Sequence, residues 1–200
     1  MNPSMTSFFL FFALTFCITL VPCPIESARA EASASASASQ NDLLTKACSL
    51  APKKDLCQQT ISSAKDNPKK DLNDLAFIAF QAASNTSASN AEFVSQTLDD
   101  VENSEEPDDA EVMQSFHDCQ QQYEGMNDEV DSALSALATR AKQDDGQIET
   151  WLKDSIAAVE TCQTSAKGKG LKVDQLTGMN QKLLDFLNNA MAVFQVVKQN

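Results

Sequence analysis

The sequence predicts an all-α fold: an up-down four-helix bundle with an N-terminal helical hairpin and two disulfides. Apolar residues recur at alternating spacings of three and four over long segments, which is typical of helices packed nearly antiparallel. No alternating run of β-branched residues indicates a strand of useful length. Helix-breaking motifs separate the segments, at Asn67-Pro68, Glu106-Pro107, Asp144-Asp145-Gly146 and Lys167-Gly-Lys-Gly170.

The beginning of the chain has the features of a secretory signal peptide. Its apolar stretch from Phe8 to Val21 is shorter than the roughly 20 residues that a membrane-spanning helix needs, which disfavours the alternative of a membrane anchor. The small-x-small motif Ala28-Arg29-Ala30 predicts cleavage after Ala30. We therefore expect a secreted protein with no membrane segment after cleavage. The expected parts are a signal peptide over 1–30, a flexible Ala/Ser lead over 31–40 and one domain over 41–200.

The chain is strongly acidic. It contains 28 Asp and Glu against 15 Lys and Arg, which gives a formal charge of −13. A nucleic-acid partner is disfavoured, because the phosphate backbone requires a basic surface. Apolar residues make up 42% of the chain, which is ordinary for a globular domain and disfavours disorder.

Four segments are expected to form the long helices. A row of mostly apolar residues at spacings of three and four, here called a seam, runs along one face of each predicted helix. Continuous seams extend from Val112 to Leu137 and from Ile148 to Cys162, and two neighbouring seams extend from Leu176 to Val197. The segment from Asp71 to Asn103 is less regular, because its small polar stretch Ser84–Asn90 lowers helix propensity.

Six cysteines fall to four when residues 1–30 are removed, and an even number in a secreted domain predicts two disulfides. Sequence alone leaves three pairings open for Cys48, Cys57, Cys119 and Cys162. Cys119 and Cys162 both lie on seams, which favours a bridge between them. Their distances from a turn near Asp144, measured along the two helices, nevertheless differ by on the order of 10 Å. The remaining pair would staple a short helical hairpin over residues 42–47 and 55–64.

The sequence offers little support for catalysis or for a bound metal or cofactor. His117 is the single imidazole, and its position predicts that it points outward without a catalytic partner. The acidic run Asp99–Glu111 is expected to be a solvated junction; calcium is the alternative, but the loop lacks the spacing of a calcium-binding loop. Zinc is disfavoured by the absence of a C-x-x-C motif. Tyr123 is expected in the core and Trp151 at its edge, with a binding anchor as the alternative for Trp151.

Several motifs in this order resemble the plant invertase and pectin methylesterase inhibitor domain from about Asp42 onward. They are Cys48-x8-Cys57, Cys119-Gln-Gln-Gln-Tyr123, Trp151-Leu152, Thr161-Cys162 and Leu187-Asn-Asn-Ala-Met-Ala192. The resemblance implies a four-helix bundle with an N-terminal hairpin, and disulfides that join the first cysteine to the second and the third to the fourth. Departures from the family pattern fall at Ala51, Lys53 and Lys54, and over Lys153–Ala157.

The implied function is that of a secreted inhibitor in the plant cell wall or apoplast, not an enzyme. The resemblance implies a free monomer that forms a non-covalent 1:1 complex occluding the substrate cleft of a pectin methylesterase, an enzyme class that is often basic. Inhibition of an acid invertase is the alternative. The loop Lys142–Gln147 lacks the Pro-Lys-Phe run that is frequent in invertase inhibitors, which together with Trp151 favours the methylesterase. A secreted helical ligand carrier, which would need a roomy apolar cavity, is a third hypothesis.

The expected partner interface lies on the second and third long helices. Thr161 matches the family motif, and the other positions are chosen because the seams point them outward. The full set is Asp118, Gln121, Glu124, Asp128, Asp131, Asp154, Glu160 and Thr161. The only sequon, Asn85-Thr86-Ser87, makes Asn85 an expected glycosylation acceptor where it faces solvent.

Overall fold

A computed structural model describes residues 39–67, 69–103, 110–139, 145–166 and 171–200, and no strand occurs among them. The expected signal peptide and nearly all of the Ala/Ser lead lie outside these residues, as do the breaks expected at Pro68, Pro107 and 167–170. The first helix covers residues 39–47, so it begins earlier than the expected Asp42 and includes the last two residues of the expected lead. Gln40 is a good helix former, which suits this extension.

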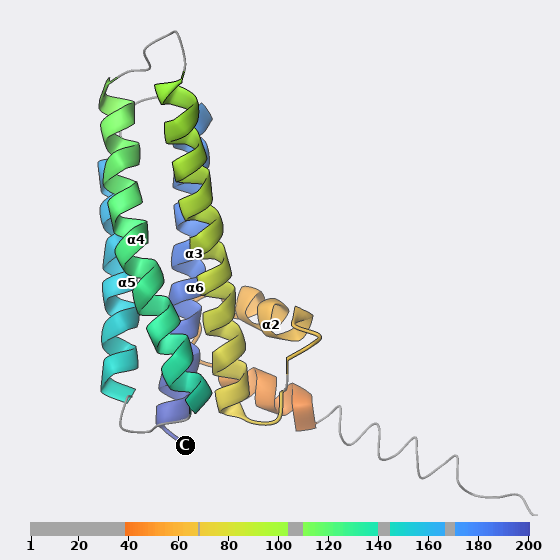
Figure 1. The fold of residues 1–200 in the computed structure, drawn as a ribbon. Helices are drawn as coiled ribbons and strands as arrows, with labels where there is room; N and C mark the ends of the chain where they lie inside the picture. The colour runs from red at the N-terminus through yellow and green to blue at the C-terminus, as the bar shows by residue number, and fades with distance from the viewer. Residues whose placement is uncertain (1–38, 68, 104–109, 140–144, 167–170) are drawn as a thin grey trace, which may run out of the picture. The chain divides into compact units, whose positions relative to one another are not determined.

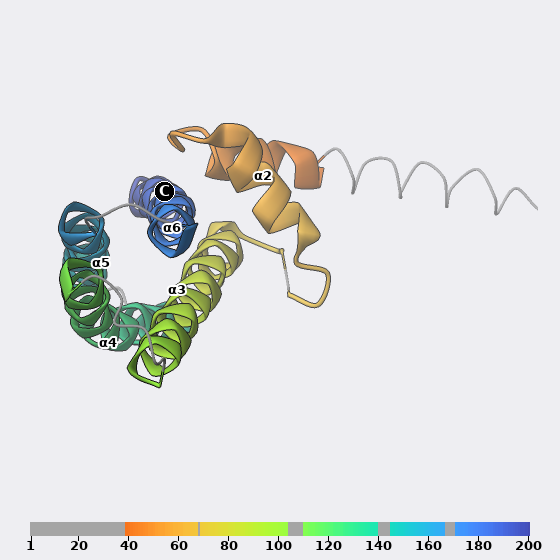
Figure 2. The same cartoon turned by 90° about the horizontal axis from the view of Figure 1, so that it is seen from above.

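Five further helices follow, whose bounds are α2 Lys54–Ser63, α3 Leu72–Glu102, α4 Ala110–Thr139, α5 Asp145–Ser165 and α6 Leu171–Lys198. The long helices α3 to α6 form an up-down bundle, in which each runs opposite to the one before it (Figure 1). Seen from above, their order around the bundle is α3, α4, α5, α6, and α6 closes the ring against α3 (Figure 2). The predicted fold class is confirmed.

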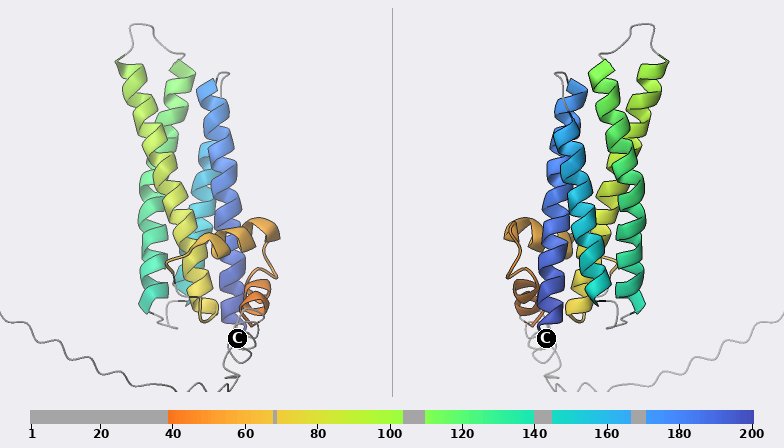
Figure 3. Two further views of the ribbon diagram at one scale, coloured as in Figure 1. Left: turned by 90° about the vertical axis from the view of Figure 1, so that its right-hand side faces the viewer. Right: turned by 90° about the vertical axis from the view of Figure 1, so that its left-hand side faces the viewer.

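The hairpin made by residues 39–47 and α2 packs outside this ring. It lies beside the lower halves of α3 and α6, on the side away from α4 and α5 (Figures 2 and 3). Its buried apolar residues are few, namely Ala47, Cys48, Ala51, Cys57 and Ile61. These residues join the core of the four long helices from one side, and the hairpin leaves the α4–α5 side uncovered.

The predicted seams form the core of the bundle. On α4, every seam residue from Phe116 to Leu137 is buried, and only Val112 at the start of the seam is half-buried. On α5, all five seam residues from Ile148 to Cys162 are buried. Burial of the Val, Leu, Ile, Phe and Met side chains among them stabilises the fold by about 1.5 to 3 kcal/mol each, so the two seams account for much of the packing of α4 and α5 in the bundle.

Helix α3 is continuous through the polar stretch that was expected to weaken it. Asp71 caps its N-terminus, because its carboxylate accepts the Asp74 backbone N–H at 3.0 Å. Within the polar stretch, Ser87 and Asn90 are buried rather than exposed. Ser87 donates to the amide oxygen of Asn127 on α4, so these small polar residues form part of the helix interface.

A buried chain of hydrogen bonds crosses the middle of the bundle and uses one residue from each long helix. The Asn90 amide of α3 donates to the Tyr123 hydroxyl of α4 at 3.1 Å, and this hydroxyl donates to the Asn180 amide oxygen of α6. The Asn180 amide in turn donates to Cys162 Sγ of α5 at 3.1 Å. Burial raises the pKa of Tyr123 to about 12, against an opposing effect of the Asn90 hydrogen bond. The phenol therefore stays neutral and the polar layer is satisfied.

Two disulfides are present, as the fold prediction requires. One joins Cys48 to Cys57 in the hairpin, and the other joins Cys119 of α4 to Cys162 of α5. Cys119 and Cys162 lie at more similar distances from the turn between their helices than the sequence analysis expected. The reason is that α4 ends at Thr139 and α5 already begins at Asp145. The two cysteines then differ by only about three residues in distance from their helix ends, or about 5 Å.

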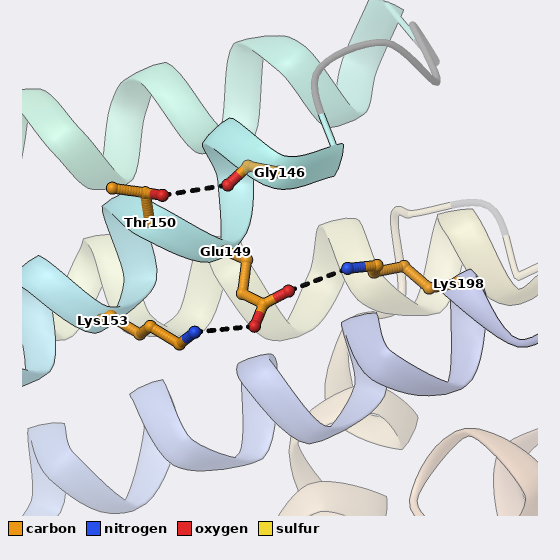
Figure 4. A network of polar contacts seen from close by, with 5 residues as sticks. All are labelled: Gly146, Glu149, Thr150, Lys153 and Lys198. Carbon is orange, nitrogen blue, oxygen red and sulfur yellow. Dashed lines mark hydrogen bonds and ion pairs between the residues drawn. The ribbon is translucent and has the colours of Figure 1, made fainter.

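Polar contacts with α6 fix the hairpin and the start of α5. The buried Asn189 amide accepts the Lys53 backbone N–H and donates to the Lys53 carbonyl, both at 3.2 Å. At the start of α5, Glu149 pairs with Lys153 and with Lys198 of α6, each at 2.8 Å (Figure 4). Hydrogen bonds from these two lysines and their charges lower the pKa of Glu149 to about 2.

Candidate functional site

The expected interface residues come from α4 and α5, which pack directly against each other. We call the outward surface of these two helices the α4–α5 face. It lies on the opposite side of the bundle from the hairpin (Figure 2). Because the hairpin does not cover it, this face is open to a partner, and it contains two hollows.

The first hollow, here named the Glu129 hollow, has a volume of about 290 Å³. Small residues make room for it, because Gly125 of α4 and Ala157 and Ala158 of α5 are among its lining residues. A Cβ added at Gly125 would meet no atom within 4 Å, so the space above this residue is open. The complete lining is Gln121, Gln122, Gly125, Met126, Glu129, Asp154, Ala157, Ala158 and Thr161.

The second hollow, here named the Trp151 hollow, is a shallow depression that is wide open to solvent, with a volume of about 650 Å³. Trp151 of α5 is half-buried against the core and contributes an aromatic side chain to the hollow. All other described lining residues belong to α4 and are Asp128, Asp131, Ser132, Ser135, Ala136 and Thr139. The expectation that Trp151 lies at the edge of the core is confirmed, and its remaining exposure faces a hollow.

Both hollows are acidic. Four carboxylates line them, from Asp128, Glu129, Asp131 and Asp154, and neither has a lysine or arginine among its described lining residues. Burial raises the pKa of Glu129, and the charge of Asp154 raises it further. A hydrogen bond from Ser155 Oγ lowers the pKa of Glu129 and so opposes this rise. The opposing effect is the smallest of the three, because Ser155 Oγ lies 3.5 Å from Glu129 Oε2 and makes a shorter hydrogen bond, of 2.7 Å, to the Trp151 carbonyl. A basic surface is therefore the electrostatic complement of this face.

The structure brings five of the eight expected interface residues into the two hollows. Those lining the Glu129 hollow are Gln121, Asp154 and Thr161, and those lining the Trp151 hollow are Asp128 and Asp131. The residues that line neither are Asp118, Glu124 and Glu160. Asp118 instead accepts a hydrogen bond from Gln114 on its own helix at 2.8 Å.

Sequence reasoning missed Glu129 and the small residues that shape its hollow. Only positions pointing directly outward were chosen, whereas Glu129 lies beside the seam and faces α5. Its spacing of three from the buried Met126, which places both on one side of the helix, was the available signal.

A hollow of about 610 Å³ lies where the ends of several helices meet, and it bears on the carrier hypothesis. Its lining includes the apolar side chains of Leu43, Leu137 and Phe194. Charged side chains of both signs also line it, Lys70 and Lys198 beside Asp71 and Asp145. This mixture favours no single class of ligand, so the carrier hypothesis stays a prediction.

Other residues that could bear chemistry lie apart from these hollows in the described part of the chain. No group of three or more His, Cys, Asp and Glu that could hold a metal ion occurs there. The expected acidic junction extends into residues 104–109, which lie outside the described residues. His117 is exposed on α4, and Tyr123 is buried. Within the described residues, no helix is both long and apolar enough to cross a membrane.

The chain is similar to known proteins in sequence pattern and in fold. The family model described as plant invertase/pectin methylesterase inhibitor matches residues 42–193. The fold is similar to a solved structure of mutant form A of a pectin methylesterase inhibitor from Arabidopsis, with a TM-score of 0.61 and 11% identity, covering 76% of this chain and 95% of that one. It is also similar to a solved structure of a pectin methylesterase inhibitor from Arabidopsis thaliana, with a TM-score of 0.54 and 13% identity. This match covers 74% of this chain and 91% of that one. No curated protein matches the sequence.

Proposed function

The chain belongs to the plant invertase/pectin methylesterase inhibitor family, and we propose that it inhibits a pectin methylesterase by docking its α4–α5 face across the substrate cleft. The observation that carries this choice of surface is the pair of acidic hollows, whose described lining residues include no lysine or arginine. A basic enzyme would be steered toward this face and held there by opposite charge. The chain itself performs no chemistry in this mechanism, because exclusion of substrate is sufficient.

The rigidity of the bundle supports inhibition by occlusion. The Cys119–Cys162 disulfide joins the two helices of the face, and their buried seams fix their spacing. A surface that is already ordered loses little conformational entropy on binding. A monomer that forms a 1:1 non-covalent complex is the simplest assembly for such a face, and it is part of the proposal.

Secretion and glycosylation complete the proposal. Cleavage after Ala30 would deliver the protein to the apoplast, where the enzyme acts on the cell wall. Asn85 is exposed on α3, and we expect it to carry a glycan that leaves the α4–α5 face free. Ser87 of the same sequon is buried, so attachment would have to precede the packing of α3 on α4. A mass shift on deglycosylation of the secreted protein, absent in Asn85→Gln, tests this expectation.

The functional test is a titration of a basic pectin methylesterase and of an acid invertase with the purified mature protein at acidic pH. We expect inhibition of the methylesterase that saturates at one equivalent and leaves the invertase unaffected. Reduction of the disulfides should abolish it. Inhibition of the invertase alone would favour the alternative target, and inhibition of neither would contradict the proposal.

A matched pair of variants tests the docking surface. Gly125 lies on the α4–α5 face and Gly178 lies on α6, and an added Cβ meets open space at both. Gly125→Arg and Gly178→Arg therefore introduce the same bulk, charge and helix propensity at two sites. We expect Gly125→Arg to weaken inhibition by on the order of tenfold or more, while Gly178→Arg inhibits like the wild type. Equal inhibition by both variants would place the interface elsewhere.

A further inference from the structure

We propose that the Trp151 hollow is the anchor site for an arginine side chain of the target enzyme, which stacks its guanidinium on the indole and pairs with Asp128 and Asp131. This inference rests on the proposed inhibitor function and makes it more specific, because it names the chemical group that the face recognises. It concerns one hollow only, since the Glu129 hollow has no aromatic residue in its lining.

The aromatic side chain is the first component of the site. Trp151 packs partly against the core, which restricts its movement, and its remaining surface lines the hollow. Tryptophan is the strongest partner for a cation over an aromatic face, and arginine occupies that position more often than lysine because its planar guanidinium also stacks. Pairs of tryptophan and arginine are also frequent among the residues that dominate binding energy at interfaces.

The carboxylates are the second component. The Asp128 carboxylate accepts no hydrogen bond from any other residue that the structure describes. Asp131 accepts one hydrogen bond, from Ser84 Oγ of α3 at 3.1 Å, and keeps further acceptor capacity. A guanidinium has five N–H donors and can serve both carboxylates, whereas a lysine ammonium is a point charge on a flexible stem.

The hydroxyls around the indole suit the same ligand. Ser132 and Thr139 use their protons within α4, donating to the carbonyls of Asp128 and Ala136. Their oxygens can therefore act as acceptors toward a ligand. The hollow thus presents acceptors, two negative charges and an aromatic surface, with no lysine or arginine among its described lining residues, which fits a cation and disfavours an anion.

Trp151 supplies a direct readout, because it is the only tryptophan in the sequence. The probes are N-acetyl-arginine amide and N-acetyl-citrulline amide, which have nearly the same shape but differ in charge. We expect Trp151 emission to respond saturably to the arginine probe, with an affinity in the millimolar range, and not to the citrulline probe. Equal responses to both probes would overturn the proposal, and so would the absence of any response.

The charge requirement is tested with isosteric variants. Asp128→Asn/Asp131→Asn keeps the size of both side chains, and Asp99→Asn/Asp100→Asn, at exposed positions of α3, is the matched control. We expect the first variant to lose the emission response to the arginine probe and to inhibit the methylesterase at least tenfold more weakly, while the control changes each value less than twofold. Wild-type inhibition by Asp128→Asn/Asp131→Asn would overturn the anchor site.

The two levels of the hypothesis can fail separately. The probe titration contains no enzyme, so a saturable arginine response remains measurable if the protein inhibits no methylesterase. In that outcome the docking function fails while the cation site stands. Conversely, full inhibition without any arginine response would leave the inhibitor function intact and remove the anchor. Circular dichroism and thermal melting of each variant ensure that neither result reflects unfolding.

Discussion

The hairpin and the four-helix bundle are held in place in different ways. The bundle is cohesive along its whole length, because each long helix buries a continuous seam and contributes to the hydrogen-bonded layer around Tyr123 and Asn180. The hairpin adds only a few residues to the core, and the Asn189 amide of α6 holds its Lys53; its own disulfide, Cys48–Cys57, closes the hairpin internally. Distributed packing makes the α4–α5 face rigid, while point attachments leave the hairpin the easier part to displace.

The largest expected effect separates the two disulfides. Removal of Cys119–Cys162, whose sequence separation is 43, should destabilise the protein by about 4 kcal/mol, and removal of Cys48–Cys57, with a separation of 9, by about 2.5 kcal/mol. We expect the melting temperature of Cys119→Ala/Cys162→Ala to fall by about 10 °C, more than that of Cys48→Ala/Cys57→Ala. Scanning calorimetry of both double variants measures the difference. A larger loss for the hairpin pair would reverse the comparison.

The polar layer of the bundle should give the next largest effect. Asn180→Ala leaves the Tyr123 hydroxyl without its acceptor in a buried site, which costs about 2 to 3 kcal/mol. Gln181→Ala is the control, because Gln181 is exposed and bonds only to Asp185 one turn along the helix. Urea unfolding measures both variants. Equal midpoints for Asn180→Ala and the wild type would mean that the layer does not stabilise the bundle.

A smaller and local effect is expected at the hairpin. Asn189→Ala removes both hydrogen bonds to Lys53 and should cost about 1 to 2 kcal/mol. Native-state hydrogen exchange should become faster in α2 and remain unchanged in the seams of α4 and α5. Asn188→Ala, which removes only a contact with the Leu184 carbonyl of the same helix, is the control. Uniform acceleration throughout the bundle would show that the hairpin is not an independent unit.

The smallest expected effect concerns Glu149, which joins the exposed ends of α5 and α6 (Figure 4). Its two lysine partners lower its pKa from 4.5 to about 2, so the carboxylate favours the folded state at pH values above about 4.5. This contribution is lost as the pH falls from 4.5 toward 2, because the carboxylate then takes up a proton. Glu149→Gln should therefore melt slightly below the wild type at neutral pH and approach it near pH 2.

Glu160→Gln provides the control for this titration, because Glu160 is exposed on the same helix. Thermal melts of both variants and the wild type at several pH values measure the difference. A gap between Glu149→Gln and the wild type that widens in acid would have the wrong sign and would contradict the assigned pairing.

Much of the bundle could be predicted because burial there follows helical periodicity. The seams of α4 and α5 are buried almost residue by residue where the spacing placed them. The polar layer was not predicted, since an asparagine is ordinarily assigned to the surface. Asn180 nevertheless lies four residues after Leu176 and three before Leu183, so its seam spacing was the signal.

The candidate site could be predicted only in part. Outward positions such as Asp128 and Asp131 follow from the seams, because they lie on the side of α4 away from its seam and are exposed. The hollows depend on how closely α4 and α5 approach and on where Gly125 and Ala157 face each other, which periodicity on one helix does not specify. The attachment of the hairpin by Asn189 is likewise a contact between distant segments that leaves no local pattern.

Carboxylate footprinting of the protein alone and with a saturating amount of a basic pectin methylesterase tests the proposed docking most directly. We expect carbodiimide labelling of Asp128, Asp131 and Asp154 to fall in the complex, because the α4–α5 face is then covered. Labelling of Asp99 and Asp100 on α3 should stay the same. Unchanged labelling of the face together with protection elsewhere on the bundle would contradict the docking of the enzyme on α4 and α5.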